Sequence, residues 1–124
     1  MIGWLAAERR RFANTVIWSW RGWRATWATQ KSLRQWTLAN FVSAGFAFTL
    51  PLGPGERALI LALGILVLAA ELFNTAIETV VDYISEEWHP KAGMAKDCGS
   101  AGVALTAIAA GVAWIFLLWR LYSG

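Results

Sequence analysis

The stretch ELFNTAIETVVD, residues 71–82, carries four polar side chains at the end of a long apolar run. They are Glu71, Asn74, Glu78 and Asp82. Because a helix turns about 100° per residue, the spacing i, i+3, i+7, i+11 places all four on one face. An ionised carboxylate costs at least about 2.5 kcal/mol at the centre of a bilayer, so such groups face a partner or a wet cavity. The stretch therefore predicts a membrane helix with a functional polar face.

The remaining sequence predicts an all-α membrane protein. The 124 residues leave room for a single domain, residues 1–124, and 57% of them are apolar. A membrane helix needs roughly 20 apolar residues, and three stretches approach that length: residues 36–52, 57–82 and 99–122. We expect three transmembrane helices, the first two joined as a hairpin through the turn sequence PLGPGE.

The N-terminal third, residues 1–35, predicts a different kind of helix. Five of its larger apolar side chains fall within an arc of about 80° at helical spacing, three of them tryptophans, although Trp18 lies on the other side and Arg9 falls within the arc. Trp prefers the membrane interface, where basic residues can meet lipid phosphates. We therefore expect an amphipathic helix on the membrane surface. Its apolar stripe consists of Phe12, Val16, Trp20, Trp23 and Trp27.

The distribution of basic residues predicts the orientation in the membrane. Seven Lys and Arg residues precede the first predicted span, and two lie in the link at residues 85–97. The hairpin link has only Arg57. Because cytoplasmic loops carry an excess of basic residues, we expect the N-terminus and the 85–97 loop to be cytoplasmic.

Three acids on one helix face suit cation binding better than helix association alone. A polar seam can join helices through hydrogen bonds, but neighbouring carboxylates repel one another. A divalent cation with oxygen ligands, together with one carboxylate left as a base, explains the row better. At the end of the following link, Lys96 can supply a positive charge to phosphate, and Asp97 is a further carboxylate. This combination at a membrane surface indicates phosphoryl transfer.

Spacing alone leaves an ion-binding protein as an alternative. The phosphate-binding motif GxxxxGK[ST] is absent, and GPGERA at residues 53–58 belongs to the hairpin turn on the opposite side of the membrane. A soluble nucleotide-kinase fold is excluded by the short chain. An ion channel or transporter built around the acids is disfavoured because only three spans are predicted.

The segment AAELFNTAIETVVDYISEEWHPKAGMAKDCGSAG, residues 69–102, strongly resembles the small bacterial integral-membrane diacylglycerol kinases and their undecaprenol kinase relatives. The resemblance is carried by ExxNxAIExxVD, a loop with His, and AKD, and it extends more weakly upstream through WSWRGWRATW and LRQ. It implies a homotrimer of three-span subunits in the bacterial cytoplasmic membrane, with active sites at subunit interfaces. It further implies transfer of the ATP γ-phosphate to a lipid hydroxyl with Mg²⁺, and no nucleic-acid partner.

The resemblance also implies roles for individual residues. Glu71 would be the general base for the lipid hydroxyl, with Asn74 as a positioning partner. Glu78 would bind Mg²⁺. The nucleotide contacts would be Arg11, Asp82, Glu87, His89, Lys96 and Asp97.

Two positions depart from the family pattern. The acidic residue that joins the second motif Glu in binding metal is Gln30 here, and another acidic position is Trp36. We expect both to lie on one helix that continues from Gln30 to Trp36. An amide oxygen can bind a hard cation but adds no negative charge, so weaker metal binding, a different metal arrangement or lost activity could follow.

These features favour a lipid kinase that converts diacylglycerol to phosphatidic acid. An undecaprenol kinase is an alternative because the two groups share the core motif. A catalytically weak relative that binds lipid or nucleotide as an interaction protein is another, because of Gln30 and Trp36.

Overall fold

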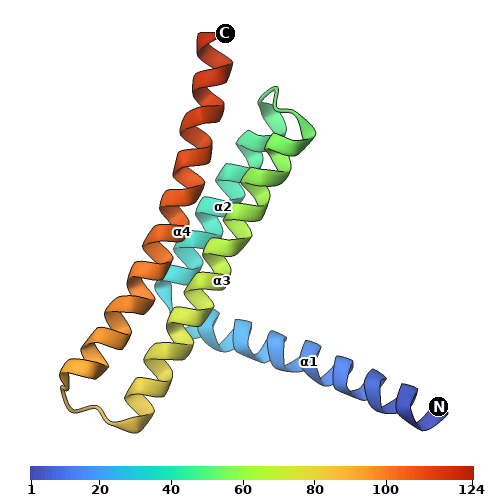
Figure 1. Cartoon of the computed structure of the whole chain (residues 1–124), viewed down its shortest axis with the longest axis vertical. Coiled ribbons are helices and arrows are strands. Elements are labelled where there is room, and N and C mark those ends of the chain that lie inside the picture. Colours follow the sequence, from blue (N-terminus) through green and yellow to red (C-terminus); the bar gives the residue numbers. More distant parts are fainter.

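The structure, a computed structural model, describes residues 1–124 and contains four α-helices and no strands. The helices are α1 (Ile2–Thr29), α2 (Lys31–Thr49), α3 (Pro54–Ile84) and α4 (Pro90–Ser123). Figure 1 shows α2, α3 and α4 running alongside one another, whereas α1 leaves the bundle at a steep angle. The α3–α4 loop lies at one end of the bundle, and the α2–α3 turn and the C-terminus lie at the other. The all-α prediction is confirmed.

The boundary between the first two helices differs from the expectation. Gln30 has extended backbone angles, φ −113° and ψ 109°, and separates α1 from α2. Its N–H donates to the Thr26 carbonyl at 2.7 Å, and the Arg34 guanidinium donates to the Trp27 carbonyl at 3.2 Å. These bonds satisfy carbonyl groups that the end of a helix leaves without partners. The predicted continuous helix from Gln30 to Trp36 is therefore wrong, and the segment 1–35 includes the first turn of α2.

Two helices are long and apolar enough to cross a membrane. They are α3 and α4, with 31 and 34 residues and mean hydropathies of 2.1 and 2.2 over their most apolar windows. At 1.5 Å per residue they extend about 46 and 51 Å, beyond a hydrocarbon core of about 30 Å. Each helix is therefore long enough to cross that core with several turns to spare. The 19-residue α2 is not among the candidate spans, so the predicted span at 36–52 stays a prediction.

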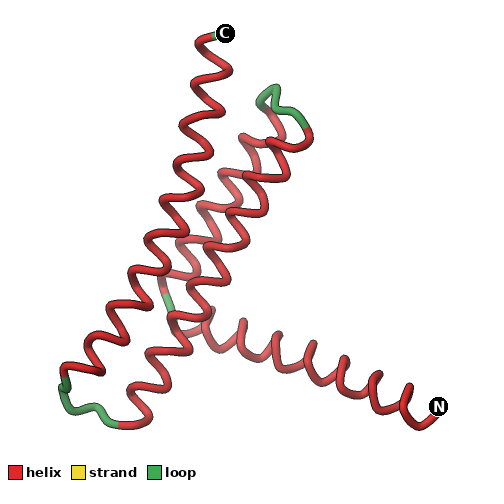
Figure 2. The backbone as a smooth tube through the Cα atoms, in the orientation of Figure 1, coloured by secondary structure: helices red, strands yellow, loops and turns green.

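The link after α3 is shorter than predicted. Figure 2 shows a brief loop there, and α4 begins at Pro90. His89 caps the helix, because its Nδ1 atom accepts a hydrogen bond from the Lys91 N–H at 3.1 Å. Pro90 is the first residue of α4, a position that suits its fixed φ and missing N–H. Lys96 and Asp97 consequently lie on α4 and not in a loop, which gives both side chains a fixed helical register.

Side-chain hydrogen bonds hold the three bundle helices in register. Trp114 on α4 donates from Nε1 to Ser43 Oγ on α2 at 2.9 Å. At the hairpin end, Arg57 donates to the Ala47 carbonyl at 2.8 Å. Bonds between apolar helices resist sliding because a displaced polar group would lose its partner.

Most apolar side chains face outward. Only ten of the 124 residues are buried, and the buried apolar cluster at the hairpin end comprises Ala47, Leu52, Ile60 and Leu117. An apolar surface this extensive is unsuited to water and suits lipid or further copies of the chain.

Candidate active site

Glu71 is the only buried ionisable side chain of the chain, with 5% of its surface exposed. It lies on α3, where the polar face meets the start of α2. The Ser32 hydroxyl donates to Glu71 Oε2 at 3.0 Å across 39 residues of sequence. A buried carboxylate needs such a donor because it has lost its hydration.

Asn74 and Glu78 form the next pair along the polar face. Asn74 Nδ2 donates to Glu78 Oε1 at 3.1 Å, and Asn74 Oδ1 is buried without a hydrogen-bond partner. The Asn74 amide lies against Gly99 on α4, where an added Cβ would collide with Oδ1. Gly99 therefore permits the close approach of α4 to this part of α3.

We expect Gly99→Ala to lower kcat about tenfold, because the new methyl group would turn Asn74 away from Glu78, and small misplacements in an active site are costly. Helix stability should hardly fall, since Ala is a better helix former than Gly by about 1 kcal/mol. The measurement is lipid phosphorylation together with the melting temperature. Gly102→Ala is the matched control, because a Cβ at Gly102 would meet no atom within 4 Å. Equal activity of the two variants would contradict the expectation.

Lys96 and Asp82 form the third pair, toward the loop end. Lys96 Nζ donates to Asp82 Oδ1 at 2.6 Å, and the two side chains are 41% and 53% exposed. This hydrogen bond raises the pKa of Lys96 above its ordinary value. Lys96 therefore stays protonated at neutral pH and presents a positive charge at the wet end of the polar face.

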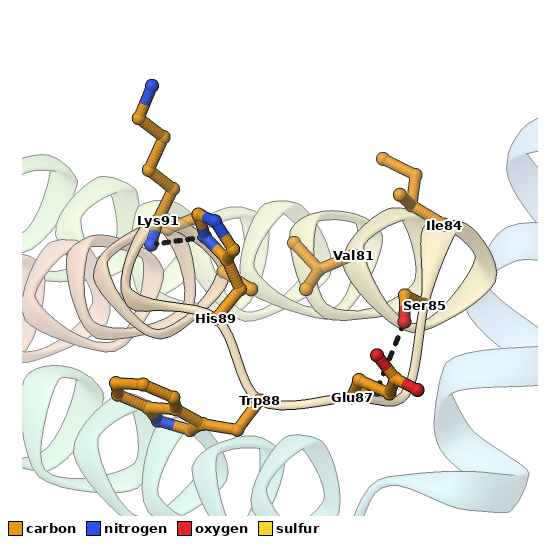
Figure 3. Close-up of a pocket in the computed structure, with 9 residues that line it drawn as sticks. Val81, Ile84, Ser85, Glu87, Trp88, His89 and Lys91 are labelled. Carbon is orange, nitrogen blue, oxygen red and sulfur yellow. Dashed lines mark hydrogen bonds between the residues drawn. The ribbon is translucent and has the colours of Figure 1, made fainter.

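The α3–α4 loop surrounds a pocket of about 410 Å³ (Figure 3). Glu87 and His89 both line it, which brings these two predicted nucleotide contacts to one cavity. The Glu87 N–H donates to Ser85 Oγ at 3.1 Å and shapes the turn. In Figure 3 the Lys91 ammonium points away from Glu87 and Ser85.

The remaining predicted site residues make no side-chain bond to the α3 row within one chain. Arg11 is exposed on α1 and pairs with Glu8 at 3.0 Å. Gln30 makes no side-chain hydrogen bond, and Asp97 is exposed on α4 without an ion pair. Within one chain, none of these three side chains makes a hydrogen bond or an ion pair with the α3 row, whereas Lys96 does.

A metal ion would have few ligands within one chain. No group of three or more His, Cys, Asp or Glu side chains is arranged to hold one. Glu78 Oε2 is, however, free of hydrogen bonds, since Asn74 occupies only Oε1. Mg²⁺ in kinase sites keeps several waters and is bound through one or two carboxylates plus substrate phosphates. Glu78 fits that pattern as a single protein ligand.

Sequence reasoning missed Ser32 and Gly99. Each touches the polar face from a different helix, so neither shares the period that groups the α3 residues. Ser32 reads as an ordinary residue near a helix start, and Gly99 as one of eleven glycines. The helical spacing of α3 alone could not have identified either contact.

Comparison with known proteins gives matches over most of the chain. Residues 17–118 match the family described as prokaryotic diacylglycerol kinase. A protein of Escherichia coli K12 named diacylglycerol kinase is 39% identical over 109 residues, 88% of this chain and 89% of the relative. Proteins of the same name from Pseudomonas aeruginosa and Haemophilus influenzae are 42% and 33% identical, covering 88% and 82% of this chain and 89% and 86% of their own lengths.

Proposed function

The chain belongs to the prokaryotic diacylglycerol kinase family, and from this premise we propose that it transfers the ATP γ-phosphate to the hydroxyl of diacylglycerol, forming phosphatidic acid. The observation that carries the proposal is the polar face of α3. It begins at the buried Glu71 and ends at the exposed Asp82–Lys96 pair. A lipid hydroxyl could reach its buried end, and a water-soluble phosphate donor its exposed end.

We propose Glu71 as the general base. Its free Oε1 would accept the proton of the lipid hydroxyl as that oxygen bonds to the γ-phosphorus, while the bond from phosphorus to the ADP oxygen breaks. The buried position of Glu71 limits water, which would otherwise compete with the lipid as acceptor. Asn74 would position the reacting groups through its hydrogen bond to Glu78.

The nucleotide would bind near the α3–α4 loop. Lys96 is already charged and could exchange its bond with Asp82 for phosphate oxygens, since the pair is about half exposed. Asp82 and Asp97 would support the same side, and the pocket beside Glu87 would accept the nucleoside. His89 lines that pocket, and Arg11 would contribute from α1.

Glu78 is the proposed Mg²⁺ ligand of the chain, with the Gln30 amide oxygen as a neutral second ligand. The free Oε2 of Glu78 supports the first assignment. When bound, the ion would neutralise charge on the transferring phosphates.

A homotrimer in the bacterial cytoplasmic membrane would complete the site. Gln30 and Arg11 make no bond to the α3 row of their own chain, and we propose that a neighbouring subunit supplies such groups. The outward-facing apolar surface supports both lipid contact and assembly. We propose three spans, including α2, with the N-terminus and the α3–α4 loop cytoplasmic, since basic residues concentrate there.

The test is phosphorylation of a lipid panel by the purified protein in mixed micelles with Mg²⁺ and labelled ATP. We expect labelled phosphatidic acid from diacylglycerol and little product from a polyprenol. Product from the polyprenol alone would instead support the undecaprenol kinase alternative. No product from either lipid, with the protein folded and assembled, would overturn the kinase proposal and leave a binding protein.

A further inference from the structure

We infer that Ser32 is a positioning residue for phosphoryl transfer, because it holds one oxygen of Glu71 and leaves the other directed to the lipid hydroxyl. The inference rests on the proposed function of Glu71 as the base. It adds a residue of α2 to a site otherwise built from α3 and α4.

The hydrogen bond between Ser32 and Glu71 joins one particular donor to one particular acceptor. Ser32 Oγ lies 3.0 Å from Glu71 Oε2, and this is the only hydrogen bond that either carboxylate oxygen makes. Glu71 is 5% exposed, so water cannot readily replace the hydroxyl. Hydrogen bonds to an ionised acceptor are roughly twice as strong as neutral ones. Ser32 therefore supplies the one protein donor to a buried carboxylate.

The fold fixes Ser32 itself. The extended Gln30 ends α1, and α2 begins at Lys31, so Ser32 lies in the first turn of α2. The next residue, Leu33, is fully buried and anchors this turn. The first N–H groups of a helix carry partial positive charge, which favours a carboxylate nearby. The helix break at Gln30 thus places both a hydroxyl donor and a helix start beside Glu71.

Tethering Oε2 restricts where Oε1 can lie. A free Glu side chain samples many rotamers and gains entropy by doing so. Holding one oxygen on the half-buried Ser32 hydroxyl removes most of these states, and the base must lie within hydrogen-bond reach of the proton it accepts. The contact should therefore act on the chemical step and not on ATP binding.

We expect Ser32→Ala to lower kcat about tenfold with little change in KM for ATP, a loss typical of slight misplacement of a reacting group. Ser32→Thr, which restores the hydroxyl, should recover most of the rate. Ser32→Cys keeps the approximate volume but has a weak donor, so it should behave like Ser32→Ala and provides a second variant if the alanine chain does not fold.

A double-mutant comparison separates positioning from structure. In a Glu71→Gln background Ser32→Ala should cause no further loss, because the base that it positions is gone. Thr37→Val on α2 is the matched control, since the Thr37 hydroxyl bonds only the Leu33 carbonyl of its own helix, at 2.8 Å. It should leave kcat unchanged.

The possible failures are distinguishable. Unchanged kcat in a folded Ser32→Ala or Ser32→Cys chain would overturn the role of Ser32 while leaving Glu71 as the base. A further tenfold loss in the Glu71→Gln background would show that Ser32 acts independently of Glu71, and would overturn the inference as well. Full activity of Glu71→Gln would overturn the proposed base itself.

Discussion

Glu71→Gln is expected to lower kcat for diacylglycerol phosphorylation by about 10²- to 10⁴-fold, the contribution typical of a general base. The amide has nearly the volume of the carboxylate, and its oxygen can still accept the Ser32 hydrogen bond. What it loses is the ability to take the hydroxyl proton. Because the change also removes a buried charge, the melting temperature should not fall. Both quantities are measurable on the same preparation in micelles.

Glu56→Gln is the matched control for this variant. Glu56 lies on the same helix at the hairpin end, where it receives two hydrogen bonds from Arg120 at 2.6 and 2.7 Å. The identical chemical change there should leave kcat intact. If Glu71→Gln turned over as fast as Glu56→Gln, another group would have to accept the proton.

The three side-chain pairs form a gradient of increasing exposure along α3. The Ser32–Glu71 pair is the most buried, and the Asp82–Lys96 pair is about half exposed. A gradient of this kind suits two substrates of opposite solubility. On the proposed function, the carboxylate that needs a dry environment would meet the lipid, and the lysine that must exchange partners would meet the nucleotide.

The row on α3 could be predicted because one helix carries all of it. Helical spacing relates Glu71 to Asp82 without knowledge of any neighbour. Pro90 likewise indicates the start of α4, because its fixed φ and missing N–H suit the first turn of a helix. Features that depend on a single helix, or on the backbone chemistry of one residue, could therefore be predicted from the sequence.

Contacts between helices could not be predicted from the sequence. The Ser32–Glu71 bond and the approach of Gly99 to Asn74 depend on the packing register of separate helices. The break at Gln30 was also missed, because no Gly or Pro marks it. In the structure the break is accompanied by the bond from Arg34 back to the Trp27 carbonyl.

Glu78→Gln is expected to lower activity at least about 10²-fold at ordinary Mg²⁺ concentrations, because a hard cation depends on anionic oxygen ligands. The loss should be severe in this chain, since Gln30 adds no second negative charge. Direct binding of Mn²⁺ as a probe, followed by electron paramagnetic resonance, should weaken in parallel. That readout separates lost metal affinity from a defect in the chemical step.

Moving a negative charge from residue 78 to residue 30 tests whether Glu78 and Gln30 bind the same metal ion. If Gln30 and Glu78 contact the same metal, Gln30→Glu alone should lower the Mg²⁺ concentration for half-maximal activity about tenfold. In a Glu78→Gln background, Gln30→Glu should restore part of the lost Mn²⁺ binding. Thr29→Glu is the matched control, one residue away in the last turn of α1. Rescue by Thr29→Glu as large as by Gln30→Glu would mean that any nearby charge suffices. Rescue by neither would place Gln30 outside the metal site.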